Sequence, residues 1–205
     1  MTADLVLKNV LLPTGRSADI VIAGGVVRHV GGAVRADEAI DCSSLTCLPA
    51  AVDMHVHMRG GVQAEKEDWR TGTESAVAGG VTVVVDQPNT IPALTTPDLL
   101  CARICEAEAH AVCGFAVNAG VTMDADLEGM RNAGAMAFGE IFAAPSSYGE
   151  GLDPETLERL LARIHAMGGL ATVHAEEVAG PAPATLADHD RTRSAAGEAH
   201  AVRTV

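Results

Sequence analysis

Residues 48–59 read LPAAVDMHVHMR, an apolar run that ends in two histidines and an arginine. Successive side chains of a strand point to opposite faces, so His55 and His57 share one face, and Arg59 has the same parity. Imidazole nitrogen binds zinc and similar divalent ions, and a guanidinium can bind a carboxylate through two hydrogen bonds. An H-x-H pair is also compatible with two ordinary strand histidines, so its meaning depends on the rest of the chain.

Strands alternate with helices from this stretch onward. The continuously apolar segment VTVVVD (81–86) is typical of a strand buried on both faces. Thr96-Pro97 and Asp153-Pro154 are typical helix starts, and Gly79-Gly80 is a typical helix end. We therefore predict strands over 48–57, 81–86, 112–121, 135–144 and 169–176, with helices over 65–78, 96–111 and 124–134, from 153 onward, and from 190 to the end.

Five strands that alternate with helices predict a parallel sheet with right-handed crossovers. We expect an α/β fold, an incomplete (β/α)8 barrel of the TIM type with about five βα units. In such a barrel the chemistry lies at the carboxyl ends of the strands, and the candidate polar groups fall there: His55, His57, Arg59, Asp86, Asn89, Glu140 and His174. An open doubly wound sheet is the rival, but RGGV (59–62) is not its G-x-G-x-x-G turn.

The segment before the alternation has a different character. Residues 3–12, 17–30 and 38–48 are aliphatic, and they are separated by turns that contain proline or paired glycines. We therefore expect two domains. Residues 1–48 would form a small β module, part of a β-sandwich, and residues 49–205 would form the N-terminal part of the barrel.

Composition narrows the class of protein. The chain has 27 acidic residues against 14 Lys and Arg, a net charge of −13, which argues against nucleic acid or an anionic membrane surface as a partner. No apolar run approaches the roughly 20 residues of a membrane span, and the N-terminus does not read as a signal peptide. The five cysteines follow no C-x-x-C spacing and fit a reducing compartment. We expect a cytoplasmic protein.

Four stretches resemble, in order, the successive motifs of the cyclic amidohydrolases: DMHVHMR (53–59), DWRTGTESAVAGGVTVVVDQPNT (68–90), GAMAFGEIF (134–142) and VHAEE (173–177). The dihydroorotase branch is the most similar, and allantoinase and hydantoinase are its neighbours. The resemblance implies that His55 and His57 bind the more buried metal ion. It also implies that Arg59 and Asn89 hold the substrate carboxylate and ring, and that His174 binds a second ion.

The resemblance also implies an acidic metal ligand on the fourth barrel strand. The family usually bridges its two metal ions there with a carboxylated lysine, and some dihydroorotases use an acidic side chain. The matching position here is Glu140, and the two lysines, Lys8 and Lys66, lie far from it in sequence. A carboxylate offers the same two oxygens as a lysine carbamate, so Glu140 is a candidate metal ligand. A surface carboxylate is the alternative, which the apolar strand around it disfavours.

The implied reaction is the interconversion of dihydroorotate and N-carbamoyl-L-aspartate in pyrimidine biosynthesis, with two divalent ions, expected to be zinc, that activate water. The family's strand-six histidine and strand-eight aspartate would lie beyond Val205, so we expect no catalytic acid–base residue within this chain. The chain would then be a fragment or a truncation, and a homo-oligomer or another chain could complete the barrel. Alternatives are an allantoinase or hydantoinase, or a catalytically silent half-barrel that serves as a scaffold or subunit.

Two acidic residues keep open roles. Asp86 matches a family acid beside the site, but it could equally cap the loop after its strand. Glu176 lies two residues past His174 on the same face, where it could orient that imidazole or be solvated.

Overall fold

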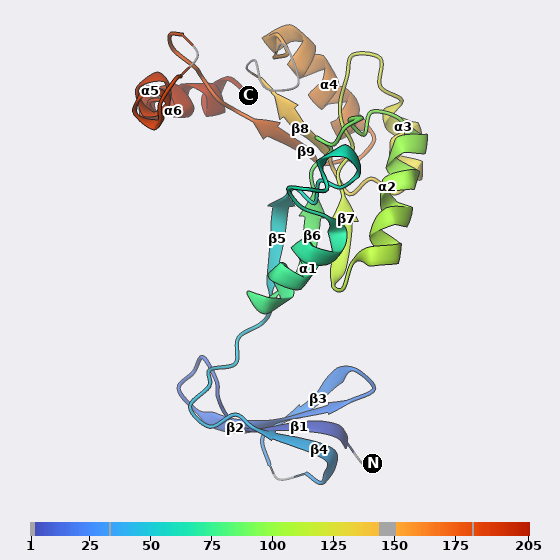
Figure 1. Ribbon diagram of the computed structural model, residues 1–205, viewed down its shortest axis with the longest axis vertical. Coiled ribbons are helices and arrows are strands. Elements are labelled where there is room, and N and C mark those ends of the chain that lie inside the picture. The colour runs from blue at the N-terminus through green and yellow to red at the C-terminus, as the bar shows by residue number, and fades with distance from the viewer. Residues whose placement is uncertain (1–2, 33, 144–150, 182) are drawn as a thin grey trace. The chain divides into compact units, whose positions relative to one another are not determined.

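The computed structural model describes residues 3–32, 34–143, 151–181 and 183–205 (Figure 1). The chain divides into two compact units, Met1–Ala50 and Ala51–Val205. No helix in this described part of the chain combines the length and the apolar composition that crossing a membrane requires.

The first unit is a four-stranded sheet of β1 (Ala3–Leu11), β2 (Ser17–Ala23), β3 (Val26–Val30) and β4 (Ala36–Asp41), in the order β3-β2-β1-β4. β1 and β4 are parallel, and the other neighbours are antiparallel. Gly24 and Gly25 both have positive φ angles, which suits the two-residue turn between β2 and β3. The expected N-terminal sheet is present in this segment, while the predicted domain division at residue 48 and the place of the sheet in a sandwich stay predictions.

The second unit contains five parallel strands. β5 (Ala51–Val56), β6 (Val81–Asp86) and β7 (Gly114–Val117) form one sheet, and β8 (Phe138–Phe142) and β9 (Ala171–His174) form another. Backbone hydrogen bonds from Ala119 N to Ala137 O and from Gly139 N to Ala119 O, both 2.8 Å, join the two sheets. The spatial order of the strands therefore follows the chain without the reversal of a doubly wound sheet. The described strands do not close into a barrel.

The helices of this unit are α1 (Trp69–Ala78), α2 (Pro97–His110), α3 (Leu127–Asn132), α4 (Pro154–Ala166), α5 (Leu186–Thr192) and α6 (Ala195–Thr204), with a 3-10 turn, η1, at Gly61–Gln63. The predicted starts of α2 and α4 are confirmed: the Thr96 side chain accepts a hydrogen bond from Leu99 N, and that of Asp153 accepts one from Thr156 N.

Three predicted helices were wrong in extent. The helix expected over 124–134 spans Leu127–Asn132, because Asp126 is its N-cap and accepts a hydrogen bond from Gly129 N. The helix expected over 65–78 begins at Trp69, because Asp68 is its N-cap and accepts a hydrogen bond from Thr71 N. The helix expected from 190 to the end is two helices, because Ser194 caps a new one and ends the continuity after α5. The strand predicted over 135–144 spans Phe138–Phe142, and residue 144 lies outside the described residues.

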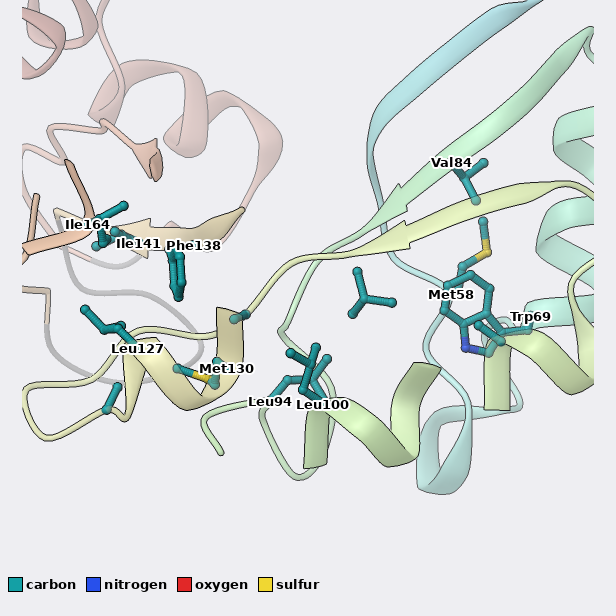
Figure 2. Packing of buried hydrophobic residues seen from close by; sticks show 14 of the residues in the cluster. Met58, Trp69, Val84, Leu94, Leu100, Leu127, Met130, Phe138, Ile141 and Ile164 are labelled. Atoms are coloured by element: carbon teal, nitrogen blue, oxygen red, sulfur yellow. The ribbon is translucent and has the colours of Figure 1, made fainter. Parts of the chain in front are cut away.

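A single apolar cluster fills the space between the strands and helices of the second unit (Figure 2). Trp69 of α1 and Leu100 of α2 lie in it beneath Val84 of β6, while Ile164 of α4 packs near Phe138 and Ile141 of β8. Phe138 and Ile141 both lie in this core although they are three residues apart, because the register of β8 shifts between them, at Gly139 and Glu140.

Candidate metal centre

Two histidines at the end of β5 and a glutamate of β8, far from them in sequence, meet in space. One donor atom each of His55, His57 and Glu140 lie within 4.8 Å of one another. His55 Nε2 is 3.8 Å from Glu140 Oε1, and the two imidazole centroids are 5.1 Å apart. Two imidazoles and a carboxylate are a donor set that zinc and similar ions accept.

Close contact between β8 and β9 places Glu140 beside the last strand. Gly139 has φ +137°, and a Cβ there would lie 2.2 Å from the Thr172 carbonyl oxygen. Only glycine permits this approach. On β9, His174 Nδ1 then lies 2.8 Å from Glu140 Oε1.

Glu140 is an almost buried carboxylate whose side chain is 8% exposed. Among the described residues, its ion pairs are with His55 and His174, and neither is with Lys or Arg. A buried carboxylate is costly unless a positive charge or hydrogen bonds compensate it. The donor set and this almost buried carboxylate, which has no Lys or Arg partner among the described residues, both fit a bound cation.

His174 has a second acidic neighbour. Its Nε2 is 3.7 Å from Glu176 Oε2, and Arg193 Nε donates a hydrogen bond of 2.5 Å to Glu176 Oε1. The Phe142 ring stacks on the His174 ring with 4.9 Å between centroids. Glu176, which the sequence left open between orienting His174 and being solvated, is therefore held by Arg193 beside that imidazole.

Asn89 links His57 to Arg59. The Asn89 side-chain oxygen lies 2.5 Å from His57 Nδ1, and the Arg59 guanidinium donates to the Asn89 carbonyl at 3.2 Å. With Nδ1 donating to the amide oxygen, Nε2 of His57 is the nitrogen available to a metal ion. The structure thus brings His55, His57, Glu140 and His174 together and places Arg59 and Asn89 next to them. Their roles as ligands and substrate contacts stay predictions.

Asp86 lies behind the site rather than in it. Its Oδ1 accepts a hydrogen bond from Met58 N at 2.8 Å, and its Oδ2 accepts one from Arg103 Nε at 2.9 Å. Burial raises the pKa of the Asp86 carboxyl, and the Arg103 guanidinium acts in the opposite direction. Sequence reasoning missed Arg103. The signal was an arginine on the buried face of α2, between Leu100 and Ala107.

A cavity of about 470 Å³ adjoins the site. Asn89 and Glu140 lie in its wall with Thr122 and Asp124 from the loop after β7 and Phe142 from β8. The cavity has room for a small ring beside the candidate ligands.

Comparisons with solved structures support the fold. The L-hydantoinase (dihydropyrimidinase) from Arthrobacter aurescens superposes with a TM-score of 0.86 over 99% of this chain and 49% of that one, at 24% identity. A D-hydantoinase structure gives a TM-score of 0.76 over 98% of this chain. The chain therefore has the fold of about half of such a protein.

Comparisons with curated proteins reach higher identity. The dihydroorotase of Methanosarcina acetivorans is 40% identical over 166 residues, which are 79% of this chain and 36% of that protein. The allantoinase of Streptomyces avermitilis is 34% identical over 186 residues, 85% of this chain and 42% of that protein. The chain thus spans about two-fifths of the length of these relatives.

The class that this fold and this group of side chains define is that of the amidohydrolases. A family model described as "Dihydro-orotase-like" matches residues 45–153, more than half of the chain. The chain belongs to the dihydro-orotase-like family.

Proposed function

We propose that this chain carries the metal-binding and substrate-binding residues of a dihydroorotase, which interconverts dihydroorotate and N-carbamoyl-L-aspartate. The observation that supports this most directly is the position of Glu140, an almost buried carboxylate between the imidazoles of His55 and His174. Similarity to dihydroorotases over about four-fifths of the chain supports the same activity.

His55, His57 and Glu140 would hold one divalent ion, and Glu140 with His174 would hold a second. We expect zinc, because imidazole and carboxylate donors suit it. Such ions, when bound, supply water that is activated near neutral pH and polarise a carbonyl. Glu140 would contribute the negative charge that two neighbouring cations require, and Asn89 would keep His57 in the tautomer that binds through Nε2.

Arg59 and Asn89 would recognise the substrate. Arg59 donates to the Asn89 carbonyl through NH1, and its planar guanidinium can also bind a carboxylate. With its side-chain oxygen at His57, the Asn89 amide nitrogen can donate to a ring carbonyl. A positive side chain at this point favours dihydroorotate, an anion, over uncharged cyclic amides.

We further propose that β5 to β9 are the first strands of a (β/α)8 barrel and that the β1 to β4 sheet is part of the accompanying sandwich. The family resemblance implies that the acid–base aspartate would lie on a later barrel strand. The activity of the whole protein, and any homo-oligomer or other chain that completes the barrel, belong to the proposal.

Substrate turnover tests the proposal. Purified native protein loaded with Zn²⁺ should hydrolyse dihydroorotate reversibly, and Arg59→Met should raise KM for dihydroorotate much more than it lowers kcat. Turnover of allantoin or a hydantoin without turnover of dihydroorotate would replace the proposed substrate. Allantoinase is the second candidate, because an allantoinase matches 85% of the chain. Zn²⁺ binding with no turnover of any of these compounds would favour a silent half-barrel.

A further inference from the structure

We propose that Asp86 and Arg103 are positioning residues that fix the turn Met58–Gly60 and, through it, His57 and Arg59. This inference rests on the proposed function of the site. Neither residue belongs to the candidate ligand group, and both are almost completely buried, with side chains 1% and 4% exposed.

The first anchor of the turn is a backbone hydrogen bond. Met58 N, the amide between His57 and Arg59, donates to Asp86 Oδ1 at 2.8 Å. The other carboxylate oxygen, Oδ2, lies 2.9 Å from Arg103 Nε and 2.8 Å from Arg103 NH2. Since Arg103 occupies one oxygen of Asp86, the other is directed at the turn.

The second anchor is the Met58 side chain, which is 4% exposed and lies against the indole of Trp69 (Figure 2). A Cβ at Gly72 of α1 would lie 2.3 Å from the Met58 sulfur, so α1 has room for Met58 only because residue 72 is glycine. The Arg103 guanidinium stacks on the same Trp69 ring, 4.7 Å from its centroid. One aromatic ring thus supports both the turn and its charged anchor.

The third anchor is the contact of Gly60 with α2. Arg59, Gly60 and Gly61 have φ angles of 42°, 78° and 53°, all in the left-handed region. A Cβ on Gly60 would lie 2.8 Å from Glu106 Oε1 and 3.1 Å from Arg103 NH1. Arg103 NH1 is itself paired with Glu106 Oε2 at 2.7 Å. The turn therefore rests directly on the Arg103–Glu106 pair.

A buried ion pair contributes little net stability, because desolvation of both charges offsets their attraction. Apolar side chains of the same volume could fill this space equally well, but they could not accept a hydrogen bond from Met58 N. The charged pair adds a hydrogen-bond acceptor in a fixed position for Met58 N. This bond sets the position of the turn and therefore of the side chains of His57 and Arg59.

The test uses an amide in place of the Asp86 carboxylate. In Asp86→Asn, the Arg103 N–H groups attract the single amide oxygen, so the amide NH2 faces the Met58 N–H and the anchor is lost. In Asp86→Asn/Arg103→Met, the amide oxygen is free to face Met58 N again. Calorimetric titration with Co²⁺ should show affinity about tenfold weaker in the single variant and partly recovered in the double variant, because the hydrogen bond to Met58 N returns while the contacts of Arg103 do not. Amide hydrogen exchange at Met58 should be fast in the first and slow in the second.

The matched control is Arg70→Met/Glu74→Gln, which removes an exposed ion pair of α1 and should leave both measurements unchanged. Wild-type Co²⁺ affinity and a protected Met58 amide in Asp86→Asn would overturn the inference. So would equal losses in the single and double variants, because they would indicate general destabilisation. Failure of the unmutated protein to bind Co²⁺ would instead overturn the proposed function, and this inference with it.

Discussion

Glu140 is the residue on which the candidate metal centre depends. It is the shared neighbour of His55 and His174, and its carboxylate is nearly excluded from water. We predict that Glu140→Gln, which keeps the size and removes the charge, weakens Zn²⁺ binding at least about tenfold. Isothermal titration with Zn²⁺ measures this, and the exposed Glu155→Gln is the control. Unchanged affinity in Glu140→Gln would mean that the residue is not a ligand.

Glu176 is predicted to act on the second ion only. It lies between His174 and Arg193, so Glu176→Gln should weaken the second Zn²⁺ binding step about tenfold and leave the first step as it was. The neighbouring exposed Glu177→Gln should change neither step. A loss of both steps in Glu176→Gln would contradict this assignment, because His55 and His57 do not contact Glu176.

At the level of single residues, the sequence predicted which candidate site residues lie together wherever regular strand geometry determines it. Parity alone put His55 and His57 on one face, and the apolar strand around Glu140 disfavoured a surface carboxylate. Helical spacing could have put Arg103 on the buried face of α2 with Leu100 and Ala107. Its pairing with Asp86 could not be predicted, because the two are 17 residues apart and only tertiary packing brings them together.

Among the elements, α4 leads to a prediction of how the stability of the fold depends on pH. Side-chain and backbone hydrogen bonds from Thr156 lower the pKa of its N-cap, Asp153. The folded-state pKa lies below the unfolded value, so this contribution to stability is present above about pH 3.8 and is lost as pH falls below it. Asp153→Asn, which can still cap the helix, should therefore show a smaller drop in Tm between pH 5 and pH 3 than the wild-type protein.

Thermal melts followed by circular dichroism over this range give the comparison. Glu155→Gln, one residue inside the same helix, is the control for a loss of charge without a loss of the cap contact. An equal pH dependence in wild-type protein and Asp153→Asn would show that the cap carboxylate does not contribute.

Elements were predicted better in kind than in extent. All five strands of the second unit were anticipated, and each is shorter than its apolar run or equal to it. Apolar residues continue past the paired residues, but at positions that the structure leaves exposed, such as Leu48, Val112, Met136 and Leu170. The break between α5 and α6 was missed because the Ser194 cap lies between two helix-forming segments.

At the scale of the whole molecule, the exposed strand β5 has a consequence for behaviour in solution. β5 pairs with β6, and no other strand in the described part of the chain pairs with it. Val52 is 57% exposed and Met54 is 74% exposed. An unpaired apolar strand invites association, so we predict that the chain self-associates and that Met54→Lys shifts it toward monomer in analytical ultracentrifugation.

The control is Met123→Lys, which replaces an exposed methionine in the loop after β7. A cooperative melt of a wild-type monomer at the same concentration would contradict the prediction. The sequence could not indicate that nearly all of β5 would be exposed, since its apolar composition predicts burial.

Trp69 gives the protein a selective optical signal. It is the sole tryptophan of the chain, it is 1% exposed, and the 50 residues of the first unit contain no Phe, Tyr or Trp. Intrinsic fluorescence excited at the indole will therefore follow unfolding of the second unit, while the first melts without an emission change. A denaturation curve that differs between fluorescence and far-ultraviolet dichroism would separate the two transitions without any label.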